Sequence, residues 1–155
     1  MRSDRSEPFL QVEIKLNPGP ADEDLVTEIW FQWDEVSYPE RYWVEDGLQL
    51  LRYWASQFTE LLSEKNATLY FMEGSFDIDL HLADELVRWE FRYLDEIIAI
   101  KHSSIRALVL ALLLAARKIR QELLLSGNPY LLGRARACVE QLEQSSKVLG
   151  LEADV

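Results

Sequence analysis

The chain has few of the residues from which catalytic and metal centres are commonly built. Its 155 residues include one cysteine, Cys138, and two histidines, His81 and His102. A single cysteine excludes an intramolecular disulfide and a cysteine-based zinc cluster. No nucleophile-elbow sequence or glycine-rich phosphate loop is present. We therefore expect no cofactor and no catalytic residue of the hydrolase or phosphoryl-transfer types.

Long apolar runs are also missing. The longest uncharged apolar run covers residues 107–116, which is short of the roughly 20 residues that a membrane-spanning helix needs. The polar start of the chain lacks the apolar stretch of a signal peptide. These absences predict a cytoplasmic protein that does not enter a membrane.

Basic residues are scarce in the first two thirds of the chain. Residues 1–100 hold 8 Lys/Arg and 22 Asp/Glu, which gives 8 − 22 = −14, and residues 101–155 give 8 − 5 = +3. The sum is the formal net charge of −11. Nucleic acid and anionic lipid repel such a chain. We therefore expect neither as a partner, and a basic protein is the better candidate.

Hydrophobic periodicity predicts an α+β fold. Apolar residues alternate, as in half-buried strands, over 10–16, 29–34, 67–72, 76–82, 87–93 and 97–101. Three- and four-residue spacing predicts helices over 46–65, 103–125 and 128–149. Asp46, Ser103 or Ser104, and Asn128 are the predicted caps. The segment 97–101 also suits the start of the following helix.

We predict one antiparallel sheet of about five to six strands, with three helices packed mainly on one face. The predicted organisation is a flexible leader over 1–8, a single domain over 9–150 and a tail over 151–155.

The segment from Asp22 to Asp46 combines acids with large aromatic side chains. It holds nine acids and a single base, Arg41. Aromatic rings supply contact energy and acids supply electrostatic steering, so this pattern is typical of a surface that meets a basic protein. Rings that cover the core as a lid are the alternative. The candidate partner-binding residues are Trp30, Asp34, Glu35, Tyr38, Tyr42, Trp43, Glu45 and Asp46.

Asp77, Asp79 and His81 form the clearest chemical motif. On a strand, residues two apart project from one face at about 7 Å spacing. Two carboxylates and an imidazole are able to hold a divalent metal or act as an acid–base pair. The solvated face of an antiparallel strand explains the same residues more simply. Cys138 lies on an apolar helix stripe and is predicted to be a core residue.

The acidic aromatic segment 30–46 and the strand–turn–strand–helix run 67–125 resemble the immunity proteins of bacterial polymorphic toxin systems. The resemblance is one of type, carried by no single motif, and no residue role is transferred. It implies an inhibitor that binds a toxin domain, often a nuclease with a basic cleft, and blocks its active site.

Three hypotheses follow. The first is a non-enzymatic binding protein with an acidic aromatic surface. The second is a small metal-assisted or carboxylate enzyme that uses Asp77, Asp79 and His81. The third is a structural or adaptor subunit that forms a homo-oligomer.

Overall fold

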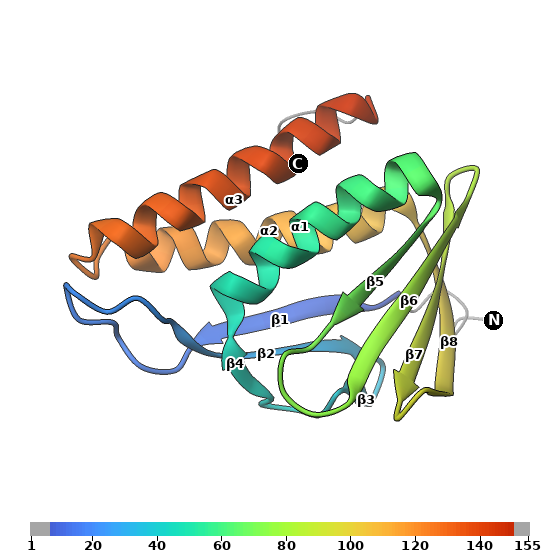
Figure 1. Cartoon of the computed structure of the whole chain (residues 1–155), viewed down its shortest axis with the longest axis horizontal. Helices are drawn as coiled ribbons and strands as arrows, with labels where there is room; N and C mark the ends of the chain where they lie inside the picture. The colour runs from blue at the N-terminus through green and yellow to red at the C-terminus, as the bar shows by residue number, and fades with distance from the viewer. Residues whose placement is uncertain (1–6, 151–155) are drawn as a thin grey trace.

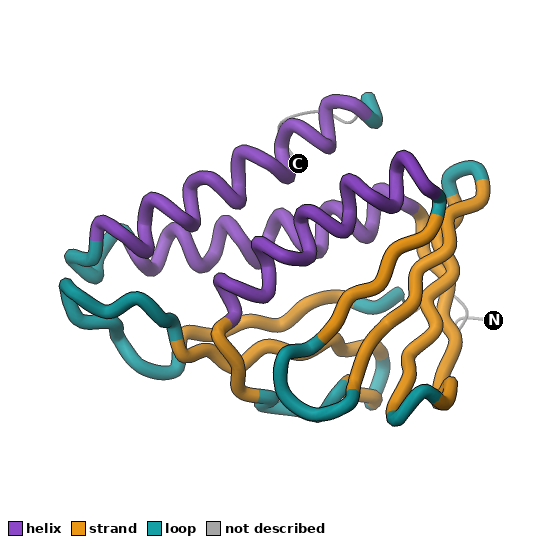
Figure 2. Tube along the Cα trace, viewed as in Figure 1, coloured by secondary structure: helices purple, strands orange, loops and turns teal. Residues whose placement is uncertain are grey.

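The computed structural model describes residues 7–150, so most of the predicted leader and the whole predicted tail lie outside the described residues. The described part contains three helices and eight strands (Figures 1 and 2). Their order is β1(Phe9–Ile14), β2(Val26–Trp33), β3(Val36–Tyr38), β4(Val44–Asp46), α1(Gly47–Glu64), β5(Asn66–Tyr70), β6(Phe76–Ala83), β7(Leu86–Tyr93), β8(Glu96–Ser104), α2(Ile105–Leu123) and α3(Pro129–Val148).

The α+β class with antiparallel pairing and three helices is confirmed, but the prediction of a single sheet is wrong. The strands form two sheets of four strands each. In sheet A, β2 pairs with β1 and, along its other edge, with β3 and β4. Sheet B is a meander in the order β5-β6-β7-β8. The three helices gather on one side of the molecule, and sheet B stands at one end of sheet A (Figure 1).

Two physical reasons explain the difference. The strands β3 and β4 have three residues each, too few to show a period of two in the sequence. Alternation reveals which side of a strand is buried, but it does not reveal which strands pair. Helix α1 separates the two groups of strands along the chain, and it packs against strands of both sheets.

The helix ends follow the predicted caps. The side chains of Asp46, Ser104 and Asn128 accept hydrogen bonds from the backbone N–H groups of Gln49, Ala107 and Leu131, which satisfies donors that the first helical turn leaves unpaired. Pro129 occupies the first turn of α3. Helix α1 ends one residue before the expected stop, because Lys65 adopts the left-handed conformation and Asn66 already belongs to β5.

The core is richest in aromatic rings where α1 meets the two sheets. The Phe31 ring of β2 stacks on Trp54 of α1, at 5.5 Å between centroids, and meets Trp89 of β7 edge-on. The ring centroids of Trp33 on β2 and Phe91 on β7 lie 4.5 Å apart. The buried indole N–H groups of Trp54 and Trp89 donate to the Tyr70 carbonyl and the Ser103 hydroxyl. This cluster joins sheet A to sheet B.

Candidate functional site

The acidic aromatic segment folds into sheet A and its connecting loops. Residues on β2 alternate between the core side, which holds Ile29 and Phe31, and the outer face, which holds Trp30. Trp30 is only 6% exposed, yet it is not part of the core cluster. Its indole N–H donates to the Gln32 Oε1 atom at 2.9 Å. Trp30 therefore faces away from the core.

Tyr42 covers Trp30 from the outside. The two rings meet edge-on, with centroids 5.3 Å apart. The Tyr42 side chain is 54% exposed, and the Arg41 guanidinium lies 4.9 Å from its ring centroid. The backbone of Tyr42 has a φ of 63°, a left-handed conformation that bulky residues rarely adopt. Such unfavourable backbone geometry is common at functional sites, where surrounding contacts hold it in place.

Three acids in the same chain segment as this ring pair are exposed: Asp34, Glu35 and Glu40. Asp34, with a φ of 48°, and Glu35 form the tight turn between β2 and β3. Over residues 7–150, no ion pair involves any of the three acids. By contrast, Glu28 on β2 pairs with Lys15 at 3.2 Å, and Glu13 on β1 pairs with Lys118 at 2.6 Å. The three acids thus carry negative charge without an ion pair in the described part of the chain, while the one base of the segment, Arg41, lies against the Tyr42 ring.

Glu45 and Tyr38 are buried and serve the fold. The Glu45 carboxylate accepts hydrogen bonds from the Trp43 indole and from the backbone N–H groups of Met72 and Glu73. It therefore ties β4 to the loop after β5. The Tyr38 hydroxyl donates to the carbonyl oxygens of Asp77 and Arg92, which are paired across β6 and β7. Burial raises the pKa of Tyr38 above its ordinary value.

The last two candidate residues, Trp43 and Asp46, are partly buried. Trp43 is half-buried, and its ring packs edge-on against Phe76 at 5.3 Å between centroids. Asp46 is occupied as the cap of α1. The structure therefore brings Trp30, Asp34, Glu35 and Tyr42 to the outer face of sheet A or its adjoining loops. It gives Tyr38, Glu45 and Asp46 structural contacts.

Asp77, Asp79 and His81 point to the outer face of sheet B, as the alternation on β6 predicts. Arg92 joins both aspartates, with its Nε 3.1 Å from Asp77 Oδ1 and its Nη1 2.9 Å from Asp79 Oδ2. Burial raises the pKa of Asp77, while the Arg92 guanidinium acts in the opposite direction. Asp77 is therefore bound up in a cross-strand ion pair and does not join His81.

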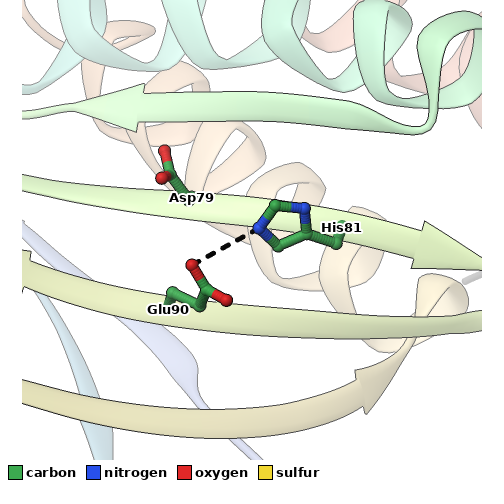
Figure 3. Close-up of side chains that lie close together, drawn as sticks. All are labelled: Asp79, His81 and Glu90. Carbon is green, nitrogen blue, oxygen red and sulfur yellow. Dashed lines mark ion pairs between the residues drawn. The ribbon is translucent and has the colours of Figure 1, made fainter. Parts of the chain in front are cut away.

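Glu90, and not Asp77, lies together with Asp79 and His81. One ligand atom from each of Asp79, His81 and Glu90 lies within 4.8 Å of the others (Figure 3). His81 Nε2 is 3.4 Å from Glu90 Oε1, and His81 Nδ1 is 2.8 Å from Asn66 Oδ1. Arg88 holds the second Glu90 oxygen at 2.9 Å. The cluster mixes three possible metal ligands with two competing arginines.

The sequence contains a signal for Glu90 that strand periodicity alone does not reveal. Asp84 and Glu85 form a two-residue turn between β6 and β7. A two-residue turn sets the register of a hairpin, and this register places Glu90 directly opposite Asp79. Counting outward from the turn therefore identifies the pair.

Comparisons with protein-family models, curated proteins and solved structures find no match to this chain. None of the helices in the described residues combines the length and the apolar character needed to cross a membrane.

Proposed function

We propose that this protein is a non-enzymatic binding module that presents an acidic aromatic face to a basic protein. We define the acidic aromatic face as Trp30, Asp34, Glu35, Glu40 and Tyr42. The observation that carries the proposal is an exposed Tyr42 ring held on a buried Trp30, in a segment whose three exposed acids form no ion pair within residues 7–150. The inferred mode of action is that of a cytoplasmic inhibitor of the immunity type.

The ring pair supports this role through its rigidity. A tyrosine supplies a large contact area at low cost in side-chain entropy, and such rings are common at energetic centres of interfaces. Trp30 supports Tyr42 from below and has its own indole N–H satisfied by Gln32. The anchor is therefore ordered before a partner arrives, which lowers the entropy lost on binding.

The surrounding acids support the choice of a basic partner. Asp34, Glu35 and Glu40 lie at solvent-exposed positions, where charge mainly raises the association rate and selects partners of opposite sign. An acidic surface of this kind suits the basic cleft of a nucleic-acid-processing enzyme. A toxin nuclease is the partner class that the resemblance implies, and binding over its cleft would exclude its substrate.

Affinity capture with matched variants tests the proposal. The bait is the purified chain, and the source is a lysate of cells that naturally express it. Tyr42→Ala is compared with Tyr130→Ala, which removes a ring of similar exposure (54% against 47%) from α3. Glu35→Lys/Glu40→Lys is compared with Glu60→Lys/Glu140→Lys, which changes the net charge equally on the helices.

We expect a basic protein that binds the wild type and both controls, is released by added salt, and is lost with both face variants. Titration calorimetry with that purified protein should then show at least a tenfold weaker Kd for Tyr42→Ala, since anchor residues contribute about 1.4 kcal/mol or more. Equal binding to face variants and controls would contradict the proposal.

One observation favours a second candidate function, a metal-assisted enzyme on sheet B: the proximity of Asp79, His81 and Glu90. We rank it second because Arg92 and Arg88 already hold the two carboxylates. Thermal unfolding with added Zn²⁺ or Mn²⁺ separates the two. A rise in Tm that is lost in His81→Ala but kept in His102→Ala would favour the metal centre over an ion-pair network.

A further inference from the structure

Strand β8 forms one edge of sheet B and is the longest strand of the described residues. Within residues 7–150, β8 is hydrogen-bonded to β7 on one side and to no strand on the other. It is nine residues long and lies at the outer margin of the sheet (Figure 1). The opposite edge, β5, has five residues and packs against α1. Long free edges offer unpaired N–H and C=O groups to a further strand.

The exposed side chains of β8 are largely apolar. Ile97, Ile98 and Ile100 are 49%, 56% and 43% exposed. Natural edge strands are commonly protected by proline, by lysine or by a bulge. β8 has no proline, and the Nζ of its one lysine, Lys101, lies 6.0 Å from the Trp33 ring centroid. Its one irregularity is a bulge, because the register to β7 passes from Ile97 to Ala99 and skips Ile98.

The sequence of β8 is complementary to itself when read in the opposite direction. The run Glu96-Ile97-Ile98-Ala99-Ile100-Lys101 has an acid at one end, a base at the other and apolar residues between. If Ile98 is set aside as the bulged residue, an antiparallel copy centred on Ala99 places Ile97 opposite Ile100. The same register places Glu96 opposite Lys101 of the second copy.

The faces of the strand agree with this register. Ile97 pairs with Arg92, and Ile100 with Glu90, so both isoleucines lie on the outer face of sheet B. Glu96 and Lys101 pair with Tyr93 and Trp89, which lie on the opposite face of β7. Each proposed cross-copy pair therefore joins side chains on one face, as antiparallel pairing about a two-fold axis requires.

We propose that β8 pairs with β8 of a second copy, so that two four-stranded sheets become one continuous sheet across a symmetric dimer. The two Ile97–Ile100 pairs and the two Glu96–Lys101 pairs are the reason that we expect a second copy of this chain at the edge of β8. The proposed β8 interface shares no residue with the acidic aromatic face, so the two proposals are tested by different variants. A one-strand interface is smaller than the standard 1,200–2,000 Å², and we expect dissociation at roughly micromolar concentrations.

Sedimentation equilibrium over a range of protein concentrations tests the proposal. We expect the mass to rise from the 18.1 kDa of one chain toward twice that value. Ile100→Lys should abolish the rise in mass, because it places a charged side chain opposite Ile97 of the second copy, and an outward lysine blocks pairing at a strand edge. Leu125→Lys, at an 89% exposed position after α2, is the control that should leave the dimer intact.

Charge exchange tests the register itself. Glu96→Lys places two lysines opposite each other, and Lys101→Glu places two glutamates opposite each other. Each should weaken the dimer by roughly threefold to tenfold, since like charges directly opposite are destabilising. The double variant Glu96→Lys/Lys101→Glu should restore the wild-type dissociation constant.

Disulfide trapping provides a second, independent measurement. Paired Cα atoms in antiparallel strands lie about 4.5–5.5 Å apart, within the range that a disulfide spans. In a Cys138→Ala background, Ile97→Cys/Ile100→Cys should form a covalent dimer on oxidation, and Ile97→Cys alone should not. A wild-type monomer at all concentrations, a dimer unaffected by Ile100→Lys, or no rescue by charge exchange would each overturn the proposal.

Discussion

At the scale of single residues, several side chains that suggest chemistry are used to hold the fold together. Glu45 accepts three hydrogen bonds, Tyr38 bridges two carbonyl groups, and Asp77 pairs with Arg92. An acid or a phenol in an acidic aromatic segment looks the same in the sequence whether it faces solvent or a buried donor. Only the position of the donors distinguishes them, and Met72 and Glu73 lie far along the chain from Glu45.

Asp77 provides a test of pH dependence at this scale. Burial raises the pKa of its carboxyl above the ordinary value of 3.8, so the folded state binds the proton more tightly than the unfolded state. Its contribution to stability is therefore fully present below pH 3.8 and is lost as the pH rises through the folded pKa. We predict that Asp77→Asn gains stability relative to the wild type between about pH 3.5 and pH 7.

Urea unfolding of both proteins at the two pH values measures this difference. The exposed Glu60→Gln, on α1, is the control and should show a smaller change with pH. Arg92 keeps its contacts with Asp79 and Asp95 in the Asp77→Asn variant, so the loss of one partner does not leave the guanidinium alone. A relative stability of Asp77→Asn that falls as the pH rises would contradict the assigned direction of the pKa shift.

At the scale of elements, helix α1 begins directly after β4 with no loop between them. The buried Gly47 is the first helical residue, and a Cβ atom placed there would collide with Thr27 Oγ1 on β2. Thr27 is fully buried and donates to the Glu45 carbonyl oxygen at 2.8 Å. The close approach of helix and strand therefore depends on glycine at position 47.

We predict opposite effects for alanine at two helical glycines. Gly47→Ala should lower the free energy of unfolding by about 2 kcal/mol, through overpacking and the disturbed Thr27 hydrogen bond. Gly133→Ala, at an exposed position in α3 with no atom within 4 Å of the new Cβ, should raise it by roughly 0.5–1 kcal/mol. Chemical denaturation measures both, and stabilisation by Gly47→Ala would contradict the packing described.

The elements show what periodicity reveals and where it fails. Long strands such as β6 and β7 and all three helices were predictable, because each contains enough residues to display its period. The three-residue strands β3 and β4 were not, although the turn and the loop that they bound carry Asp34, Glu35, Glu40 and Tyr42. Tyr42 lies between β3 and β4, so the ring pair with Trp30 follows from a loop conformation that the residue pattern does not specify.

At the scale of the whole molecule, the division into two sheets depends on contacts between segments far apart in the chain. Trp33 meets Phe91, and Asn128 donates to the backbone carbonyls of Gly19 and Asp22. Such contacts tie sheet A to sheet B and to the start of α3. From these contacts we predict that residues 9–150 unfold as one cooperative unit.

Cys138 is a built-in probe of that cooperativity. It is 2% exposed on α3, and burial raises the pKa of its thiol to about 12. A thiol reagent at about pH 8 therefore reacts only with molecules in which α3 has opened. If opening is global, Gly47→Ala, at the first residue of α1, should speed labelling of Cys138 by the same factor as it raises the unfolding equilibrium constant. For a loss of about 2 kcal/mol this factor is roughly thirtyfold. Labelling that stays at the wild-type rate would mean that α3 opens by itself, and the chain would then contain two stability units instead of one.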